Sequence, residues 1–304
     1  HSNNNMNPWC LLLAQNIYHN HNIKMSGGRQ MARTVPATKK GPIARLIGTV
    51  DIDGNGTNHP LEQVDPFMLL DQATITKNEM PPFGSHPHRG HSVVTVLLQG
   101  QIKSWDSVTQ KEATVQGPAS YFVDAASGLF HDETSVISDE SDADQHPVLF
   151  QLWMSVKEED RVKPPALQYD TNLPLGDVNN DIGEVIGSIR YFVGGENVSI
   201  KTAHPIMVGL VTQQPGTTAK IPIDSSFGGF VVHIEGCATY GDNSDSTSTE
   251  NDVVVFAHTT DETENFLQAT TDSNLSGTCR YLICTGQRIE EPWFKKLVAN
   301  GAII

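Results

Sequence analysis

The sequence lacks long apolar runs and an excess of basic charge. None of its hydrophobic segments approaches the roughly 20 residues that span a bilayer, so we expect no membrane-spanning helix. Its 20 Lys and Arg residues stand against 35 Asp and Glu residues, which gives a formal net charge of −15. Because this charge would repel a phosphate backbone, we expect no direct binding to nucleic acid.

Cysteine is scarce as well. The four cysteines form no CxxC pair, and their spacing fits no zinc-site pattern; they are Cys10, Cys237, Cys279 and Cys284. Such spacing favours reduced thiols in an intracellular protein. We therefore expect a cytoplasmic or nuclear location, with organelle targeting by the N-terminal segment as an alternative.

Helical periodicity is also scarce, and strand signals dominate. The apolar segments are short, rich in Val, Ile, Phe and Tyr, and separated by Gly, Pro, Asn and Asp, which is typical of strands joined by turns. We predict an all-β fold of two similar units with few short helices. The clearest strand candidates are residues 43–50, 92–98, 121–125 and 148–156 in the first half, and residues 206–212, 230–234, 253–258 and 280–285 in the second.

Composition divides the chain into three parts. Residues 24–46 are rich in Lys and Arg and poor in acids, and we expect residues 1–42 to form a disordered or targeting arm. Residues 157–181 contain three prolines and little apolar periodicity, which predicts a long connection between two barrels. We place the first β unit at residues 43–165 and the second at residues 166–304.

The segment with the most chemical content is Gly84-Ser85-His86-Pro87-His88-Arg89-Gly90, which immediately precedes the predicted strand 92–98. Extended backbone sends residues i and i+2 to the same face. His86 and His88 therefore point together, while Pro87 points away. Two imidazoles on one face are half of a metal site, although the pair alone fits a structural or surface role equally well.

A second short segment supplies the other half. His131-Asp132-Glu133 presents one imidazole and one carboxylate to a common side, with Asp132 on the opposite side. If the two segments lie side by side, we predict one divalent metal ion held by His86, His88, His131 and Glu133. This ligand set leaves open positions on an octahedral ion and suits Fe(II) first, with Mn, Ni, Co, Cu and Zn as alternatives.

Other histidines carry weaker signals. His19 and His21 repeat the HxH spacing in a polar segment without a strand, and we expect them to be inert. The second half has no HxH or HxE pair, since His204, His233 and His258 are far apart in sequence. Each of these three is expected to be a lone strand or turn histidine.

Several segments together resemble the successive signatures of the pirin family, in the same order and at similar spacing. The resemblance covers about residues 43 to 175 closely and residues 286–292 more weakly. Its segments are DPFMLLD at residues 65–71, HPHRG at 86–90, the stretch from Gly117 to ASGLFHDE ending at Glu133, and QLW at 151–153. The resemblance implies a bicupin, two jelly-roll-like β-barrels in tandem, in which only the N-terminal barrel binds metal through positions matching His86, His88, His131 and Glu133.

The same resemblance implies two alternative functions. One is a dioxygenase of the quercetin 2,3-dioxygenase type, in which Glu133 is the catalytic residue, as ligand or base, and Phe83 packs against a flat aromatic substrate. Its partners would be that substrate and dioxygen. The other is a non-enzymatic, metal-dependent regulator that binds protein partners such as transcription factors. We expect a monomer in either case.

The sequence departs from the pirin pattern at three places. Pirins usually have Phe-Glu after HPHRG, whereas this chain has His91 and Ser92, which changes the surroundings of the ligands. By alternation we expect His91 to share a face with Val93, away from the metal pair, and to be either exposed or a non-ligating neighbour of the ligands. Pro118 replaces the usual acidic residue, and the chain ends at Ile304, where pirins typically continue.

Overall fold

The fold is built almost entirely of strands. A computed structural model describes residues 29, 31–35, 38–40, 42–48, 64–77, 84–241, 247–256, 258–259 and 265–290. Within these ranges the only helices are two short 3₁₀ helices, η1 (Ala143–Gln145) and η2 (Glu158–Asp160), and no described helix is long and apolar enough to cross a membrane. The all-β prediction is confirmed.

The chain forms two compact units that exchange short segments. The N-terminal unit comprises Ala37–Pro174, Tyr191–Val208 and Gly286–Ile304. The C-terminal unit comprises His1–Pro36, Leu175–Arg190 and Gly209–Thr285. Each unit is described separately below.

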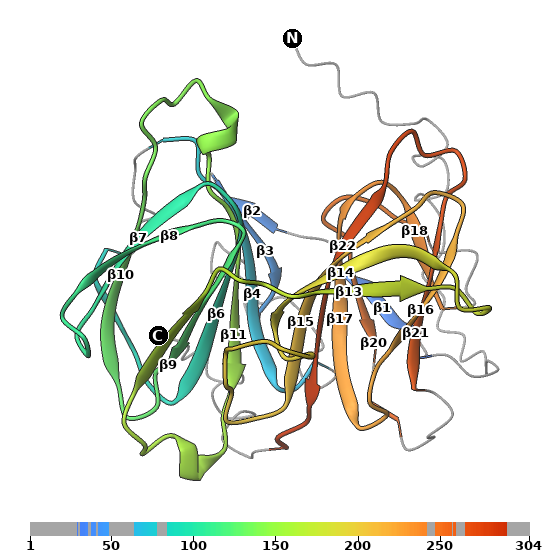
Figure 1. The fold of residues 1–304 in the computed structure, drawn as a ribbon. Coiled ribbons are helices and arrows are strands. Elements are labelled where there is room, and N and C mark those ends of the chain that lie inside the picture. Colours follow the sequence, from blue (N-terminus) through green and yellow to red (C-terminus); the bar gives the residue numbers. More distant parts are fainter. Residues whose placement is uncertain are drawn as a thin grey trace. The chain divides into compact units, whose positions relative to one another are not determined.

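Two antiparallel sheets build the N-terminal unit, whose strands are mostly blue to green in Figure 1. The larger sheet consists, in spatial order, of β12 (Ala166–Asp170), β9 (Ala119–Asp124), β6 (His91–Gln99), β11 (Val148–Ser155), β4 (Phe67–Thr74), β3 (Ile43–Ile47) and β2 (Thr38–Lys40). The smaller sheet consists of β5 (His86–His88), β10 (Leu129–Ser135), β7 (Gln101–Asp106) and β8 (Glu112–Gln116).

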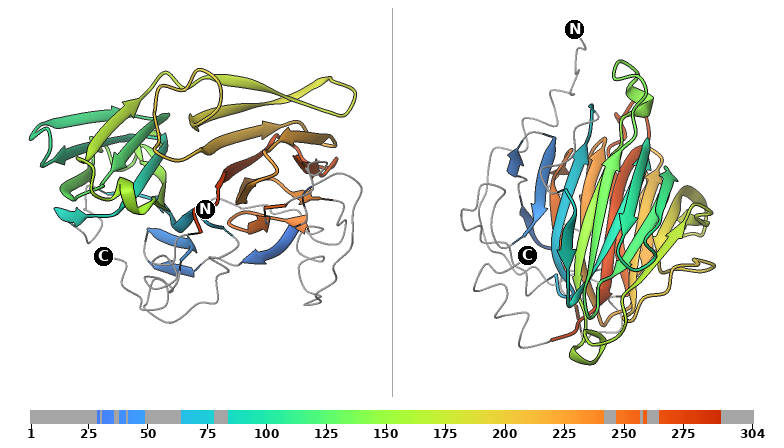
Figure 2. Two further views of the ribbon diagram at one scale, coloured as in Figure 1. Left: turned by 90° about the horizontal axis from the view of Figure 1, so that it is seen from below. Right: turned by 90° about the vertical axis from the view of Figure 1, so that its left-hand side faces the viewer.

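The C-terminal unit repeats this arrangement with a larger and a smaller sheet, whose orange and red strands are seen in Figure 2. Its larger sheet consists of β1 (Met31–Val35), β20 (Val253–Phe256), β17 (Phe227–Glu235), β22 (Cys279–Gln287), β15 (Ile206–Gln213), β14 (Val185–Val193) and β13 (Leu175–Asn179). The smaller sheet consists of β16 (Thr218–Pro222), β21 (Phe266–Thr271), β18 (Ala238–Tyr240) and β19 (Thr247–Ser248).

All eight strand candidates correspond to strands, with ends that shift by a few residues: they match β3, β6, β9 and β11 in the N-terminal unit and β15, β17, β20 and β22 in the C-terminal unit. These segments are rich in β-branched and aromatic residues, which pack well on a pleated surface. Each of the eight also lies in the larger sheet of its unit.

Side-chain alternation fills the interior of the N-terminal unit from both of its sheets. On β6, Val93 and Leu97 are buried together with Ile102 of β7, Val115 of β8 and Leu129 of β10. Residues two apart on a strand share a face, so the side chains between Val93 and Leu97 on that face also point inward. The interior therefore has an apolar part, and polar residues on the same strands can line the remainder.

The predicted arm contains ordered strands. β1 pairs with β20 of the C-terminal unit, and β2 pairs with β3 of the N-terminal unit, although both lie within residues 1–42. These two strands therefore lie in sheets, which local composition does not indicate because backbone pairing joins distant segments; the bounds and role of the arm stay a prediction. Residues 1–28 lie outside the described residues.

The proline-rich connection also contributes a strand. β12 begins at Ala166, just after the end predicted for the first unit at residue 165, yet it pairs along its length with β9 of the N-terminal unit. β13, from Leu175, is the first strand of this region that pairs within the C-terminal unit. Proline marks interruptions in pairing, but it does not show which sheet receives the next strand.

The cysteines differ in oxidation state. Cys279 and Cys284 are free and buried, whereas Cys237 is disulfide-bonded. The expectation that the thiols are reduced is thus corrected for Cys237, because disulfide formation depends on spatial proximity and not on sequence spacing.

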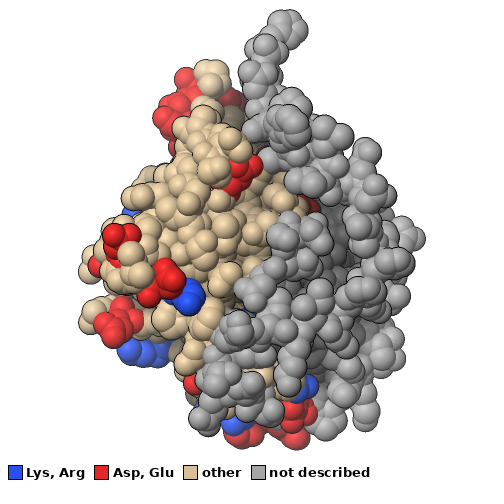
Figure 3. Space-filling model, turned by 90° about the vertical axis from the view of Figure 1, so that its right-hand side faces the viewer, with Lys and Arg blue, Asp and Glu red and all other residues tan. Residues whose placement is uncertain are grey.

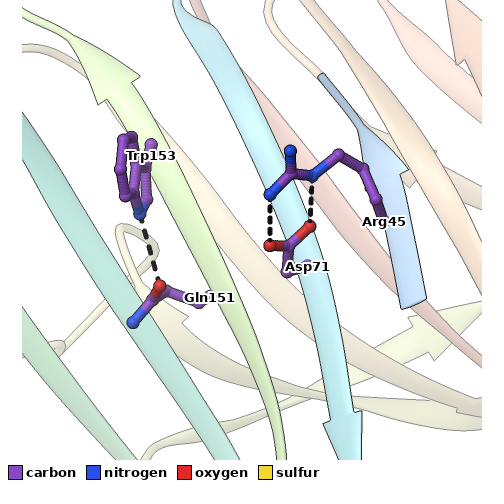
Figure 4. A network of polar contacts seen from close by, with 4 residues as sticks. All are labelled: Arg45, Asp71, Gln151 and Trp153. Carbon is purple, nitrogen blue, oxygen red and sulfur yellow. Dashed lines mark hydrogen bonds and ion pairs between the residues drawn. The ribbon is translucent and has the colours of Figure 1, made fainter. Parts of the chain in front are cut away.

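Charged side chains lie mainly at the surface. On the face shown in Figure 3, acidic side chains form several separate groups among uncharged residues. A partly buried pair joins β3 to β4 in Figure 4: Arg45 donates through Nε to Oδ1 of Asp71 and through Nη2 to Oδ2, both at 2.8 Å. Such a bidentate pair fixes the alignment of the two strands.

Candidate metal centre

Strand pairing brings the two predicted ligand segments together. β5 and β10 are antiparallel neighbours, in which His86 lies directly opposite His131 and His88 lies opposite Leu129. Directly opposed residues share a face of a sheet, as do residues two apart on a strand. His86, His88 and His131 therefore project to the same side, as the alternation predicted.

The three histidines converge through their Nε2 atoms. His86 Nε2 lies 3.0 Å from His88 Nε2 and 3.1 Å from His131 Nε2. In the part of the chain that the structure describes, these side chains form the one group of at least three His, Cys, Asp or Glu residues whose ligand atoms all lie within 4.8 Å of one another. Three imidazole nitrogens thus face a common point.

This spacing fits a transition-metal ion. Two nitrogens at right angles around an ion, with bonds of about 2.1 Å, lie about 3.0 Å apart. The observed separations of 3.0 and 3.1 Å match that value. Without an ion, bare nitrogens at this distance would repel each other, so the donor set suits a divalent metal.

Burial keeps two of these imidazoles neutral. The side chains of His88 and His131 are 1% and 0% exposed. Burial, reinforced by the neighbouring histidines, lowers the pKa of His88 from 6.5 to about 2 and that of His131 to about 3. Since a metal binds only the unprotonated ring nitrogen, this environment prepares both side chains for coordination.

Glu133 lies on the same face of β10 as His131 but is not part of the three-histidine group. Its Oε1 accepts a hydrogen bond from Thr95 Oγ1 at 3.1 Å, and its Oε2 accepts one from Gln151 Nε2 at 3.0 Å. Burial raises the pKa of this carboxyl to about 7. Of the four predicted ligands, the structure brings the three histidines together, whereas the carboxylate of Glu133 is held beside them by Thr95 and Gln151.

His91 lies inside the barrel, next to the ligands. Its side chain is 4% exposed, and its Nε2 lies 3.0 Å from Nδ1 of His88. The expectation that it faces away from the metal pair is wrong, because Gly90, with φ of +75°, interrupts the extended chain between β5 and β6. Alternation cannot be counted through such a residue. The structure thus excludes an exposed His91 and places its side chain beside His88, one of the candidate ligands.

Several residues around the site were not predicted as functional. Gln151 and Trp153 lie two apart on β11, and Trp153 Nε1 donates to Gln151 Oε1 at 3.4 Å (Figure 4). Thr95 lies opposite Gln151 in the pairing of β6 with β11. Alternation along β6 and β11 could have assigned these side chains to one face of each strand. Only the pairing of the strands shows that this face points into the barrel. Phe83 lies outside the described residues.

The remaining histidines have separate environments. His204 Nε2 lies 2.8 Å from the carbonyl oxygen of Gln287, and His233 Nδ1 lies 3.0 Å from the hydroxyl of Tyr240. Neither belongs to a metal-binding group among the described residues. His19 and His21 lie outside the described ranges.

Comparison with known sequences identifies relatives of the chain. Residues 49–154 match the profile of the Pirin family. A pirin-like protein of Arabidopsis thaliana is 26% identical over 230 residues, which cover 75% of this chain and 71% of that protein. A Pseudomonas aeruginosa protein, whose name provisionally assigns it quercetin 2,3-dioxygenase activity, is 27% identical over 190 residues; these cover 60% of this chain and 64% of that protein, which is less than two thirds of its length.

Solved structures share the fold. GK1651 from Geobacillus kaustophilus has a TM-score of 0.70 at 22% identity, over 88% of this chain and all (100%) of that one. The bacterial pirin YhhW from Escherichia coli, in complex with nickel(II), has a TM-score of 0.57 at 14% identity, over 87% of this chain and 98% of that one.

The sheet architecture and the histidine cluster are those of a metal-binding bicupin. Each of the two tandem β units has a larger and a smaller antiparallel sheet, and one unit holds a three-histidine cluster in which His88 and His131 are buried. These are the features of a bicupin with a single candidate metal site among the described residues. Residues 49–154 match the Pirin family, and over most of its length the chain is similar to pirin-like proteins.

Proposed function

We propose that this chain is a metal-dependent dioxygenase of the quercetin 2,3-dioxygenase type that acts on a flavonol. The observation that carries the proposal is the convergence of three Nε2 atoms, at 3.0 and 3.1 Å, inside the N-terminal barrel. The name of the Pseudomonas aeruginosa relative supports the substrate class.

His86, His88 and His131 would hold the ion. Three nitrogen donors suit first-row divalent metals, of which Fe(II) is the first candidate, with Mn, Ni, Co, Cu and Zn as alternatives. The nickel(II) complex of the Escherichia coli pirin supports a divalent ion as the cofactor class. When bound, such an ion supplies Lewis-acid activation of a substrate hydroxyl and, in the case of iron, redox chemistry with dioxygen.

Glu133 is proposed as the group that accepts the hydroxyl proton of the substrate. Thr95 and Gln151 each donate to one of its oxygens, which fixes the orientation of the carboxylate on the interior face of β10. A positioned carboxylate can take a proton from a hydroxyl within hydrogen-bond reach. In its alternative role as fourth metal ligand, Glu133 would have to exchange at least one of these hydrogen bonds for the ion.

Two tyrosines form an aromatic wall beside the candidate site. The rings of Tyr121 on β9 and Tyr169 on β12 stack with their centroids 4.7 Å apart and an interplanar angle of 2°. The Tyr121 centroid lies 6.3 Å from that of His131, and Tyr169 is 37% exposed. We propose that the flat rings of a flavonol pack near this wall, with the Tyr169 hydroxyl, 2.9 Å from Ser104 Oγ, as a polar contact.

Oxygen consumption tests the proposed activity. The purified chain is loaded with Fe(II), its metal content is measured, and oxygen uptake with quercetin is followed in an electrode. Since a dioxygenase transfers both atoms of O₂ to its products, we expect one O₂ consumed for each quercetin oxidised, without an added reductant. The His88→Ala variant, treated in the same way, serves as the control for reaction with free iron.

An absence of uptake by a fully iron-loaded site would reject the dioxygenase proposal. The same three histidines would then serve the alternative function, a metal-dependent regulator that binds a protein partner. Metal binding without oxygen uptake would therefore decide between these two functions.

A further inference from the structure

The ring nitrogens of His91 have two defined neighbours. Nδ1 lies 3.1 Å from the carbonyl oxygen of Arg89, and Nε2 lies 3.0 Å from Nδ1 of His88. A carbonyl oxygen can only accept, so Nδ1 of His91 carries the proton and donates it. In a neutral imidazole the other nitrogen is then an acceptor, which makes Nε2 of His91 the acceptor toward His88.

This assignment determines the tautomer of His88. Because His91 Nε2 is the acceptor, the shared proton belongs to Nδ1 of His88. The neutral ring of His88 then has a bare Nε2, and this atom is the one that faces Nε2 of His86 at 3.0 Å. The chain of contacts from Arg89 through His91 thus exposes the correct nitrogen of His88 to the metal position.

Packing holds His91 in this orientation. The indole of Trp153 stacks on the His91 ring with centroids 4.8 Å apart and an interplanar angle of 24°, and it meets the His88 ring edge-on at 5.1 Å. His88 and His91 are 1% and 4% exposed, so water has little access to replace the hydrogen bond between them. A packed and buried partner is what fixes the direction of a metal ligand.

The three candidate ligands are supported differently. His86 Nδ1 lies 2.8 Å from the carbonyl oxygen of Gly84, which fixes its tautomer directly through the backbone. Nδ1 of His131 is buried without a hydrogen-bond partner. His88 depends on a second histidine, His91, whose Nε2 lies 3.0 Å from Nδ1 of His88.

We propose that His91 is a positioning residue, which holds His88 as the Nδ1–H tautomer and thereby presents its Nε2 to the metal. This inference rests on the metal site of the proposed function, but not on the reaction that the site performs. It assigns His91 a specific role that a mere packing residue would not have.

Two substitutions separate the hydrogen bond from the packing. His91→Phe keeps an aromatic ring against Trp153 but removes the acceptor, whereas His91→Gln retains an amide oxygen that can accept from His88. Competition with a chelator, using Ni(II) as the probe, gives the metal affinity of each folded variant. We expect His91→Phe to bind Ni(II) about 10-fold or more weakly than the unmodified chain, and His91→Gln to recover most of that loss.

Long-range ¹H–¹⁵N NMR of the metal-free protein provides the second measurement. We expect a protonated Nδ1 and a bare Nε2 for His88 in the unmodified chain, and a mixture of tautomers in His91→Phe. An Nε2–H tautomer in the unmodified chain overturns the proposal, as does equal Ni(II) affinity of the unmodified chain and His91→Phe. If His91→Phe does not fold, as judged by circular dichroism, the proposal is tested by the tautomer of His88 in the unmodified chain and by the Ni(II) affinity of His91→Gln.

Failure of the metal site can be distinguished from failure of the role proposed for His91. If the unmodified chain binds no Ni(II) or Fe(II), the metal site itself is wrong, while the tautomer measured without metal still tests the contact between His88 and His91.

Discussion

Both units bury histidines, but the ring nitrogens of those histidines meet different partners. In the C-terminal unit, His233 Nδ1 lies 3.0 Å from the hydroxyl of Tyr240, and its Nε2 lies 3.9 Å from Sγ of Cys279. In the N-terminal unit, the Nε2 atoms of the buried His88 and His131 lie 3.0 and 3.1 Å from Nε2 of His86, which is partly buried. Burial alone therefore does not identify a metal ligand. The candidate ligands differ from other buried histidines because their Nε2 atoms converge on one point.

The polar groups described in the two interiors also differ. The C-terminal interior contains uncharged polar groups that satisfy one another: Tyr281 donates to Oε1 of Gln213 at 2.6 Å, and Gln213 Nε2 donates to the carbonyl of Ala269 at 3.1 Å. The N-terminal interior places the carboxylate of Glu133 beside the histidine cluster. A buried carboxyl group has a desolvation cost, so its presence next to candidate ligands favours a chemical role over a purely structural one.

We expect the largest change in bound metal when a histidine of the candidate site is removed, and none when His233 of the C-terminal unit is removed. His88→Ala leaves two of three converging nitrogens, so we expect it to remove most of the bound metal. His233→Ala, and His19→Ala in the N-terminal segment, should keep the metal content of the unmodified chain. Metal analysis of the purified variants, with circular dichroism as a check of folding, measures this. Equal losses in all three variants would contradict the assignment of the site.

The second prediction concerns Glu133, the carboxyl group inside the N-terminal unit. Glu133→Gln keeps the shape of the side chain but cannot accept a proton, so we expect oxygen uptake with quercetin to fall about 100-fold. If Glu133 acts as a base and not as a ligand, the variant retains the Ni(II) affinity of the unmodified chain in chelator competition. A large loss of affinity in Glu133→Gln would instead identify the carboxylate as the fourth ligand. Unchanged oxygen uptake would exclude both roles.

A smaller effect, on the pH dependence of stability, is expected for His233 in the C-terminal unit. Burial lowers the pKa of His233 from 6.5 to about 4, so its protonation favours the unfolded chain. Its contribution to stability is complete above pH 6.5 and is lost as the pH falls toward 4, with about 2 kcal/mol lost by pH 5. Urea unfolding of His233→Gln should therefore depend less on pH between 7 and 5 than unfolding of the unmodified chain. Identical pH dependence would show that His233 does not titrate on unfolding.

Much of the fold could be predicted from local sequence. The strands around Val93, Phe122 and Val231 follow from short β-branched and aromatic runs, because such residues favour a pleated surface wherever it forms. β12 shows the limit of this reasoning. Its residues follow a proline-rich segment, and only backbone pairing with β9 assigns the strand to the N-terminal unit. The order of strands in a sheet depends on contacts between distant parts of the chain.

Within the candidate site, reasoning along a single extended segment was reliable. His86 and His88 point together, and His131 joins them through the pairing of β5 with β10. The predicted direction of the His91 side chain was wrong, because Gly90 interrupts the extended chain between His88 and His91 and alternation cannot be counted across it. The prediction that Glu133 binds the metal remains open to the affinity measurement of Glu133→Gln.

Local sequence is sufficient to predict that this chain is built of strands and that two tripeptides each carry a pair of donor groups on one face, since both properties depend only on the local backbone. Only contacts between distant segments bring the donors together, place Thr95 and Gln151 against Glu133, and bring His91 against His88. These contacts join residues through strand register and chain reversal, and no local pattern specifies either one.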